Sequence, residues 1–70
     1  MRVNTQLLEK KIKESGIKVS FIIEKLGLSS EGFYKKKRGE IPFRIAEIYV
    51  LCDLLRISES EKPLIFYPES

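Results

Sequence analysis

Hydrophobic residues recur at helical spacing in the first part of the chain, and glycines separate the repeats. The stripe before Gly16 consists of Val3, Leu7, Leu8 and Ile12. The stripe between Gly16 and Gly27 consists of Val19, Ile22, Ile23 and Leu26. Residues at these intervals share one face of an α-helix, and glycine readily ends a helix in the left-handed conformation. The pattern predicts a first helix with Asn4 or Thr5 as its N-cap and a second, well-packed helix before Gly27.

Two further helices are predicted after Gly27. Ser29 is a good N-cap for a third helix that runs to about Lys37, with Phe33 facing inward. The loop that follows Gly39 places Pro42 at or near the first turn of the next helix. The fourth helix has the clearest apolar stripe, which consists of Ile45, Ile48, Tyr49, Cys52 and Leu55 and is widened by Leu51 and Leu54.

The tail of the chain is compatible with two structures. Residues 58–61, Ser-Glu-Ser-Glu, resemble a capping box, but a helix begun at Ser58 would hold Pro63 in its interior at a cost of about 3 kcal/mol. With Ser60 as the N-cap, Pro63 falls in the first turn, and a short helix through Phe66 is predicted. The alternative is a strand at residues 64–67, whose side chains suit a pleated sheet.

The composition indicates a single globular domain, residues 1–70. Hydrophobic residues make up 43% of the chain and charged residues 33%, a balance typical of folded proteins. No apolar run approaches the roughly 20 residues of a membrane span, and the N-terminus lacks the apolar core of a signal peptide. We therefore predict an all-α fold, a compact bundle of about five short helices with a tail that is helical or extended, and a cytoplasmic location without a membrane partner.

Few of the residues that enzymes use are present. The chain has no histidine and one cysteine, Cys52, so a Cys–His nucleophile pair, a zinc site and an intrachain disulfide are excluded. No glycine-rich phosphate loop occurs. Cys52 is interpreted as a small buried hydrophobe. We predict no enzyme, no catalytic residue, no cofactor, no metal and no small-molecule ligand.

Positive charge is concentrated in the N-terminal part. Residues 1–44 contain eleven Lys or Arg against five Glu, whereas residues 45–70 contain two against five acidic residues. This distribution favours a polyanion as partner. Residues 19–38 predict two short helices joined by a tight glycine turn, the second more basic than the first, which is the layout of a helix-turn-helix. A basic run such as residues 35–38 is usually a solvated face, but at the end of a recognition helix it favours DNA.

Residues 22–29, Ile-Ile-Glu-Lys-Leu-Gly-Leu-Ser, resemble the Leu-Ala-x-x-Leu-Gly-Ile-Ser core of the Cro/CI-type (XRE) family of phage and bacterial transcriptional regulators. The continuation through Phe33–Gly39 and Phe43 to the helix that ends at Leu55 is similar to small phage-type members. The resemblance covers about residues 7–66. It implies a bundle of about five helices, double-stranded operator DNA as partner, and a homodimer on a two-fold symmetric site.

The sequence differs from the family pattern in three places. Ile23 replaces the usual alanine, and Ser20 is the nearest polar substitute for a glutamine that often opens the first motif helix. Lys36 and Lys37 occupy the zone where an inward apolar residue normally closes the motif. One of these two lysine stems is expected to lie over the core.

The resemblance also implies roles for individual residues. The base-facing set consists of Ser30, Glu31, Gly32, Tyr34 and Lys35. The phosphate-binding set consists of Ser20, Ser29, Lys37, Arg38 and Arg44. Lysine suits guanine O6 and N7, glutamate accepts from cytosine N4, and glycine leaves room for a base edge. Each of two base-facing residues also has a purely structural interpretation. Glu31 is favourably placed near the positive end of the helix dipole, and Gly32 is simply tolerated in the helix.

Two function hypotheses follow. The first is a sequence-specific transcriptional regulator, a phage-type repressor or Cro-like protein that binds its operator as a dimer. Its dimer contact is predicted in an apolar tail that is hard to bury in so small a bundle: Leu64, Ile65, Phe66, Tyr67 and Pro68. The second is a protein-binding module on the same fold, antitoxin-like or inhibitor-type, whose working surface is this tail and the acidic C-terminal face.

Overall fold

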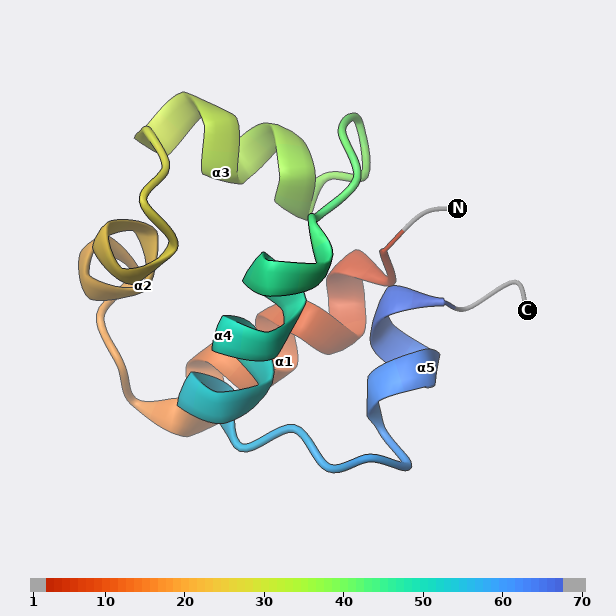
Figure 1. Ribbon diagram of the computed structural model, residues 1–70. Helices are drawn as coiled ribbons and strands as arrows, with labels where there is room; N and C mark the ends of the chain where they lie inside the picture. Colours follow the sequence, from red (N-terminus) through yellow and green to blue (C-terminus); the bar gives the residue numbers. More distant parts are fainter. Residues whose placement is uncertain (1–2, 68–70) are drawn as a thin grey trace.

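The computed structural model describes residues 3–67, and this part of the chain folds into five α-helices without a strand. They are α1 (Thr5–Ser15), α2 (Val19–Leu26), α3 (Ser30–Lys37), α4 (Ile45–Leu55) and α5 (Lys62–Phe66). The predicted all-α fold is thereby confirmed. Figure 1 shows α4 running through the middle of the molecule, with α3 along the top edge, α2 at the left and α5 at the right.

One cluster of buried apolar side chains holds the helices together. It consists of Leu8, Ile12, Ile22, Phe33, Ile48, Leu51, Leu55, Ile57, Ile65 and Phe66. The central helix α4 packs against both α1 and α2. Because helices of five to eleven residues are marginal on their own, burial in this shared cluster is what stabilises each of them.

The buried face of α4 differs from the predicted stripe. Ile45 and Tyr49, which were assigned to the core, are 69% and 62% exposed. Glu47 is buried instead, together with the apolar face of Ile48, Leu51 and Leu55. Apolar residues surround most of this helix, so helical spacing alone is satisfied by more than one face, and packing against α1 and α2 selects one of them.

Two further expectations are corrected. Pro42 lies outside α4, two residues before its N-cap Arg44, and therefore belongs to the loop rather than to the first turn. The predicted close packing of α2 holds for Ile22, but Phe21 is an exposed aromatic residue of the same helix.

Asn4 caps α1 as predicted, since its Oδ1 accepts a hydrogen bond from the Leu7 amide at 3.2 Å.

The tail forms the short helix α5 rather than a strand. Glu61, not Ser60, occupies the N-cap position, and Pro63 lies in the first turn, where proline is tolerated. The capping-box bonds form just ahead of the helix: Glu61 Oε1 accepts from the Ser58 amide at 2.9 Å, and Ser58 Oγ accepts from the Glu61 amide at 3.2 Å. Local side-chain bonds thus fix the turn that starts α5.

Burial of two tail residues corrects the expectation that this apolar stretch is hard to bury in so small a bundle. Ile65 and Phe66 are only 2% and 5% exposed, so neither is accessible to a second chain. The Asn4 amide donates a hydrogen bond of 2.6 Å to the Ile65 carbonyl, which ties α5 to the start of α1. Leu64 remains 58% exposed, Tyr67 is partly buried, and Pro68 lies outside the described residues.

None of the helices in residues 3–67 is long and apolar enough to cross a membrane.

An ion pair between α1 and the start of α5 predicts a pH dependence of stability. The Lys11 ammonium lies 2.7 Å from Glu61, and its hydrogen bond, with those from Ser58, lowers the pKa of Glu61 from 4.5 to about 2. A carboxyl group with a lowered folded-state pKa stabilises the fold above its unfolded pKa and loses this effect as the pH falls toward the folded value. The contribution of Glu61 is therefore complete above pH 4.5 and fades between pH 4.5 and about 2.

We expect Glu61→Gln to lower the free energy of unfolding at pH 7 and the difference from wild type to narrow as the pH falls from 4.5 to 2. Urea unfolding at a series of pH values measures both quantities. Glu59→Gln, at an exposed position two residues earlier, is the matched control. A difference between wild type and Glu61→Gln that stays constant over this pH range would contradict the assignment.

Candidate nucleic-acid interface

A three-residue connection, residues 27–29, fixes how the chain passes from α2 to α3. Gly27 adopts the left-handed conformation with φ 69°, its amide donates to the Glu24 carbonyl at 3.0 Å, and the Leu28 amide donates to the Ile23 carbonyl at 3.2 Å. These two bonds form a Schellman motif, which ends α2 sharply. Ser29 then caps α3, because its Oγ accepts a hydrogen bond from the Gly32 amide at 3.0 Å. Hydrogen bonds therefore fix the backbone both at the end of α2 and at the start of α3.

The helix α3 is attached to the bundle through few groups. Phe33 is its one buried residue, and the hydroxyl of Thr5 in α1 donates a hydrogen bond of 2.7 Å to the Lys37 carbonyl at its far end. Figure 1 shows α3 along the outer edge of the molecule, crossing the direction of α2, which is seen end on. Most of the surface of α3 consequently faces outward.

The five residues assigned to base reading all belong to α3. Ser30, Glu31 and Tyr34 are exposed, whereas Gly32 and Lys35 are partly buried. A Cβ atom on Gly32 would lie 3.2 Å from Ser29 Oγ, so the N-cap gives a structural reason for glycine beside that of room for a base edge. Positions 30, 31, 34 and 35 lie on one side of a helix with 3.6 residues per turn. The structure thus brings four of the assigned side chains onto one face.

The residues assigned to phosphate binding are distributed over several elements. Ser20 is exposed in the first turn of α2, and Arg44 is exposed just before α4. Lys37 shares a surface groove with Val19, the first residue of α2, and with side chains of α1. The Ser29 hydroxyl oxygen accepts a hydrogen bond from the Gly32 amide, so its own O–H would donate the hydrogen bond to a phosphate.

Three cations on or next to α3 form ion pairs with carboxylates. Lys35 lies 3.8 Å from Glu31, Lys37 lies 3.7 Å from Glu9, and Arg38 Nε lies 2.6 Å from Glu40. The hydrogen bond from Arg38 holds the pKa of Glu40 below its usual range. Each pair has a carboxylate in contact with solvent, and such ion pairs are weak because water screens the two charges. Their cations are therefore available to a polyanion at little energetic cost.

Glu47 has a role that the sequence did not indicate. Its carboxylate is buried in α4 and accepts two hydrogen bonds from Lys36 Nζ, at 2.7 and 2.8 Å, and one from the Arg44 amide at 2.8 Å. Of the two lysines with an expected inward stem, Lys36 thus lies inward with its charge paired. Acidic residues three positions after an N-cap are one local signal for such a site, but they do not identify the lysine partner.

Other candidate chemistry is sparse in the described part of the chain. No group of three or more His, Cys, Asp and Glu residues is placed to hold a metal ion within residues 3–67. Cys52 is partly buried in the packing around α4, and burial raises the pKa of its thiol. The polar face of α3 is therefore the surface on which a functional interpretation rests.

Comparison with protein-family models, with curated proteins and with solved structures finds no match to this chain.

The N-cap of α3 gives a prediction about the stability of this surface. We expect Ser29→Ala to lower the free energy of unfolding by about 1 kcal/mol, because the Gly32 amide loses its acceptor. Ser30→Ala at the next, exposed position is the control and should change stability by less than about 0.5 kcal/mol. Urea denaturation followed by circular dichroism measures both. Equal effects of the two substitutions would show that the Ser29 hydroxyl does not cap the helix.

Proposed function

We propose that this chain is a sequence-specific DNA-binding transcriptional regulator, a phage-type repressor or Cro-like protein that binds a two-fold symmetric operator as a homodimer. In this proposal α2 and α3 form a helix-turn-helix, and α3 is the recognition helix. The observation that carries it is the eight-residue helix α3, whose one buried residue is Phe33 and whose residues Ser30, Glu31 and Tyr34 are exposed at the outer edge of the bundle.

The dimensions and chemistry of α3 suit the major groove. A helix with its side chains is about 10–12 Å across, and the major groove of B-DNA is about 12 Å wide. Lys35 and Glu31 supply a donor for guanine and an acceptor for cytosine, and Tyr34 and Ser30 lie exposed beside them. The ion pair between Lys35 and Glu31 is loose at 3.8 Å, so either side chain is able to turn toward a base edge.

Phosphate contacts are expected around α3. Arg38 and Arg44 are exposed, and Lys37 lies near the start of α2. The helix α2 begins without a side-chain cap, which leaves its first amides to bind an anion in the field of the helix dipole. Such contacts place a protein on the duplex without reading its sequence.

The size of the chain favours a dimer. One copy measures 29 × 23 × 20 Å, whereas successive major grooves on one side of DNA are about 34 Å apart. A single chain therefore reaches one half-site. The part of the tail that is accessible for a subunit contact is Leu64, because Ile65 and Phe66 belong to the core.

A protein-binding module on the same fold is the second candidate, and one observation favours it. Ile45 and Tyr49 are exposed and lie one helical turn apart on α4, where they form an apolar surface unrelated to α3. Exposed apolar patches often contact other proteins. Weak duplex binding without sequence preference would support this candidate over operator recognition.

Separate roles for base and phosphate contacts give a test of the DNA proposal. Lys35→Ala is expected to cost about 1–3 kcal/mol on the preferred operator and to relax its preference at one position. Arg44→Ala should weaken all duplexes alike. Selection from a random duplex library, followed by binding measurements on the selected and on random sequences, provides the comparison. If both variants lose affinity equally for every sequence, the assignment of roles is wrong.

Salt dependence tests the phosphate contacts as a set. Three cations per subunit, Lys37, Arg38 and Arg44, make six contacts in a dimer and predict a slope of log Kd against log salt of about 5 in magnitude.

Leu64→Asp should reduce the mass in sedimentation to that of one 8.2 kDa chain. Ile41→Asp, at an exposed apolar residue of the loop before α4, is the control. A dimer that survives Leu64→Asp would exclude a tail-mediated contact.

A further inference from the structure

Lys36 differs from the other cations of residues 35–38 in where its charge lies. Its side chain is only 11% exposed, and that of its partner Glu47 is 8% exposed. Lys35 and Arg38, by contrast, are paired with carboxylates that remain in solvent contact. The run of four basic residues therefore contains one cation that faces the interior.

The Lys36–Glu47 pair joins two helices at a defined point. Lys36 is in the last turn of α3, and Glu47 is in the first turn of α4. The ammonium contacts both carboxylate oxygens, and Glu47 Oε1 also accepts the Arg44 amide that precedes α4. No buried side-chain nitrogen or oxygen within residues 3–67 lacks a hydrogen-bond partner. Both charged groups thus have hydrogen-bond partners, which a buried charge pair requires to be tolerated.

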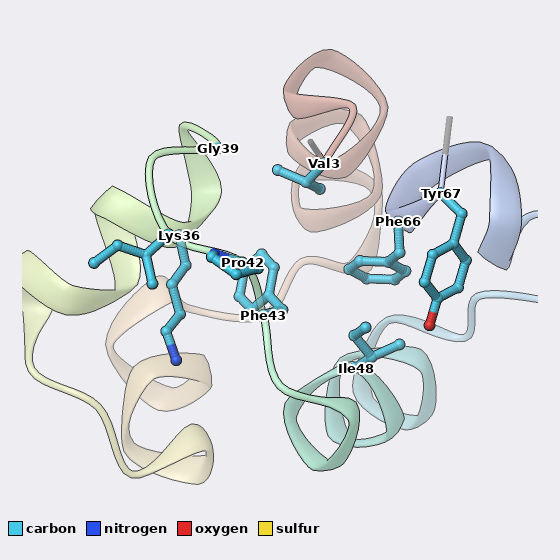
Figure 2. Close-up of a pocket in the computed structure, with 9 residues that line it drawn as sticks. Val3, Lys36, Gly39, Pro42, Phe43, Ile48, Phe66 and Tyr67 are labelled. Carbon is cyan, nitrogen blue, oxygen red and sulfur yellow. The ribbon is translucent and has the colours of Figure 1, made fainter. Parts of the chain in front are cut away.

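The loop between α3 and α4 encloses the stem of Lys36. Figure 2 shows this side chain extending alongside Pro42 and Phe43, with Ile48 and Phe66 across a small cavity of about 80 Å³. The ring of Phe43 packs edge-on against Phe66 with centroids 5.9 Å apart. The loop is therefore anchored to α5 beside the Lys36 side chain, which is 11% exposed.

We propose that the Lys36–Glu47 ion pair is a positioning element that fixes the C-terminal end of α3 against α4, and that Lys36 makes no contact with the bound polyanion. Its directional hydrogen bonds act beside the bond from the Thr5 hydroxyl to the Lys37 carbonyl, and together they set the rotation and the distance of α3 around the buried Phe33. The consequence for DNA recognition rests on the function proposed above, but the mechanical role does not.

This role separates two properties of DNA binding. Non-specific binding depends on the number of phosphate contacts, which the pair does not change. Sequence discrimination depends on side chains held within about 0.5 Å of their productive positions. Loss of the pair should therefore reduce discrimination and leave the salt dependence unchanged.

The decisive variant is the double substitution Lys36→Met with Glu47→Gln. It keeps the net charge of the chain and removes the ion pair, while the amide oxygen introduced at position 47 still provides an acceptor for the Arg44 amide. The single variant Lys36→Met leaves a buried carboxylate without its cation and is expected to be the less stable of the two. Arg38→Met is the matched control, because it removes an exposed cation two residues away.

Without DNA, amide hydrogen exchange tests the mechanical role. In the double variant, exchange of the α3 amides is expected to rise by about tenfold or more relative to those of α1, because α3 opens locally while the bundle stays folded. Arg38→Met should leave this ratio unchanged. An unchanged ratio in the double variant would overturn the proposal whether or not the chain binds DNA.

With DNA, the affinities for the selected operator and for a random duplex are measured over a range of salt concentrations. The double variant should keep the wild-type slope and lose about tenfold or more in the ratio of the two affinities, comparable to the loss of one base contact. Arg38→Met should reduce the slope by about 0.9 per contact. A reduced slope in the double variant would place Lys36 on phosphate, and an unchanged ratio would show that the pair does not position α3. Failure of the wild type to bind any duplex would instead refute the proposed function and leave the exchange measurement to decide the role of the pair.

Discussion

Burial of a few apolar side chains from each helix in one common cluster is the constraint on which this molecule depends. Isolated helices of this length are marginal in water, and a chain of 70 residues buries only about 60% of the surface that its unfolded form exposes. The central position of α4 lets every other helix reach the same core. Single fully buried side chains, Ile22 from α2 and Phe33 from α3, attach these two helices to that core.

Because α3 contributes only Phe33 to the core, it retains a polar surface that is accessible to a ligand. A helix that gave more side chains to the core would have less surface for a ligand. The structure compensates for the small core contribution at the two ends of α3. The Schellman turn and the Ser29 cap fix its start, and the Thr5 hydroxyl and the Lys36–Glu47 pair hold its end. The polar face is thus supported by hydrogen bonds rather than by additional hydrophobic contacts.

Charge on this surface is balanced within the chain itself. Lys35, Lys37 and Arg38 each have a carboxylate within 4 Å. Pairs in contact with solvent exchange partners readily, because their interaction is weak in water. The pair at Lys36 does not, since both of its members are buried. A single basic run therefore contains cations of two kinds, which sequence charge counts treat as equal.

Local rules were sufficient to predict much of this molecule from its sequence. Gly27 with a left-handed backbone, Ser29 and Asn4 as N-caps, and Phe33 as the inward residue of α3 all follow from interactions within a few residues of the chain. The same reasoning predicted the first four helices and located the polar segment from Ser30 to Lys35, but it left the tail open between a helix and a strand. Short-range geometry and hydrogen bonding determine these features, whatever the rest of the fold does.

Only the tertiary structure decided the features that depend on which surfaces meet. The sequence placed Ile45 and Tyr49 in the core because their spacing suited a helix that is apolar on most sides, and packing chose the face with Glu47 instead. Ile65 and Phe66 are buried because α5 docks beside α1. The partner of Lys36 lies eleven positions further along the chain, on another helix. Contacts between distant segments carry no local signature, so the sequence alone could name the basic run but not the lysine that it buries.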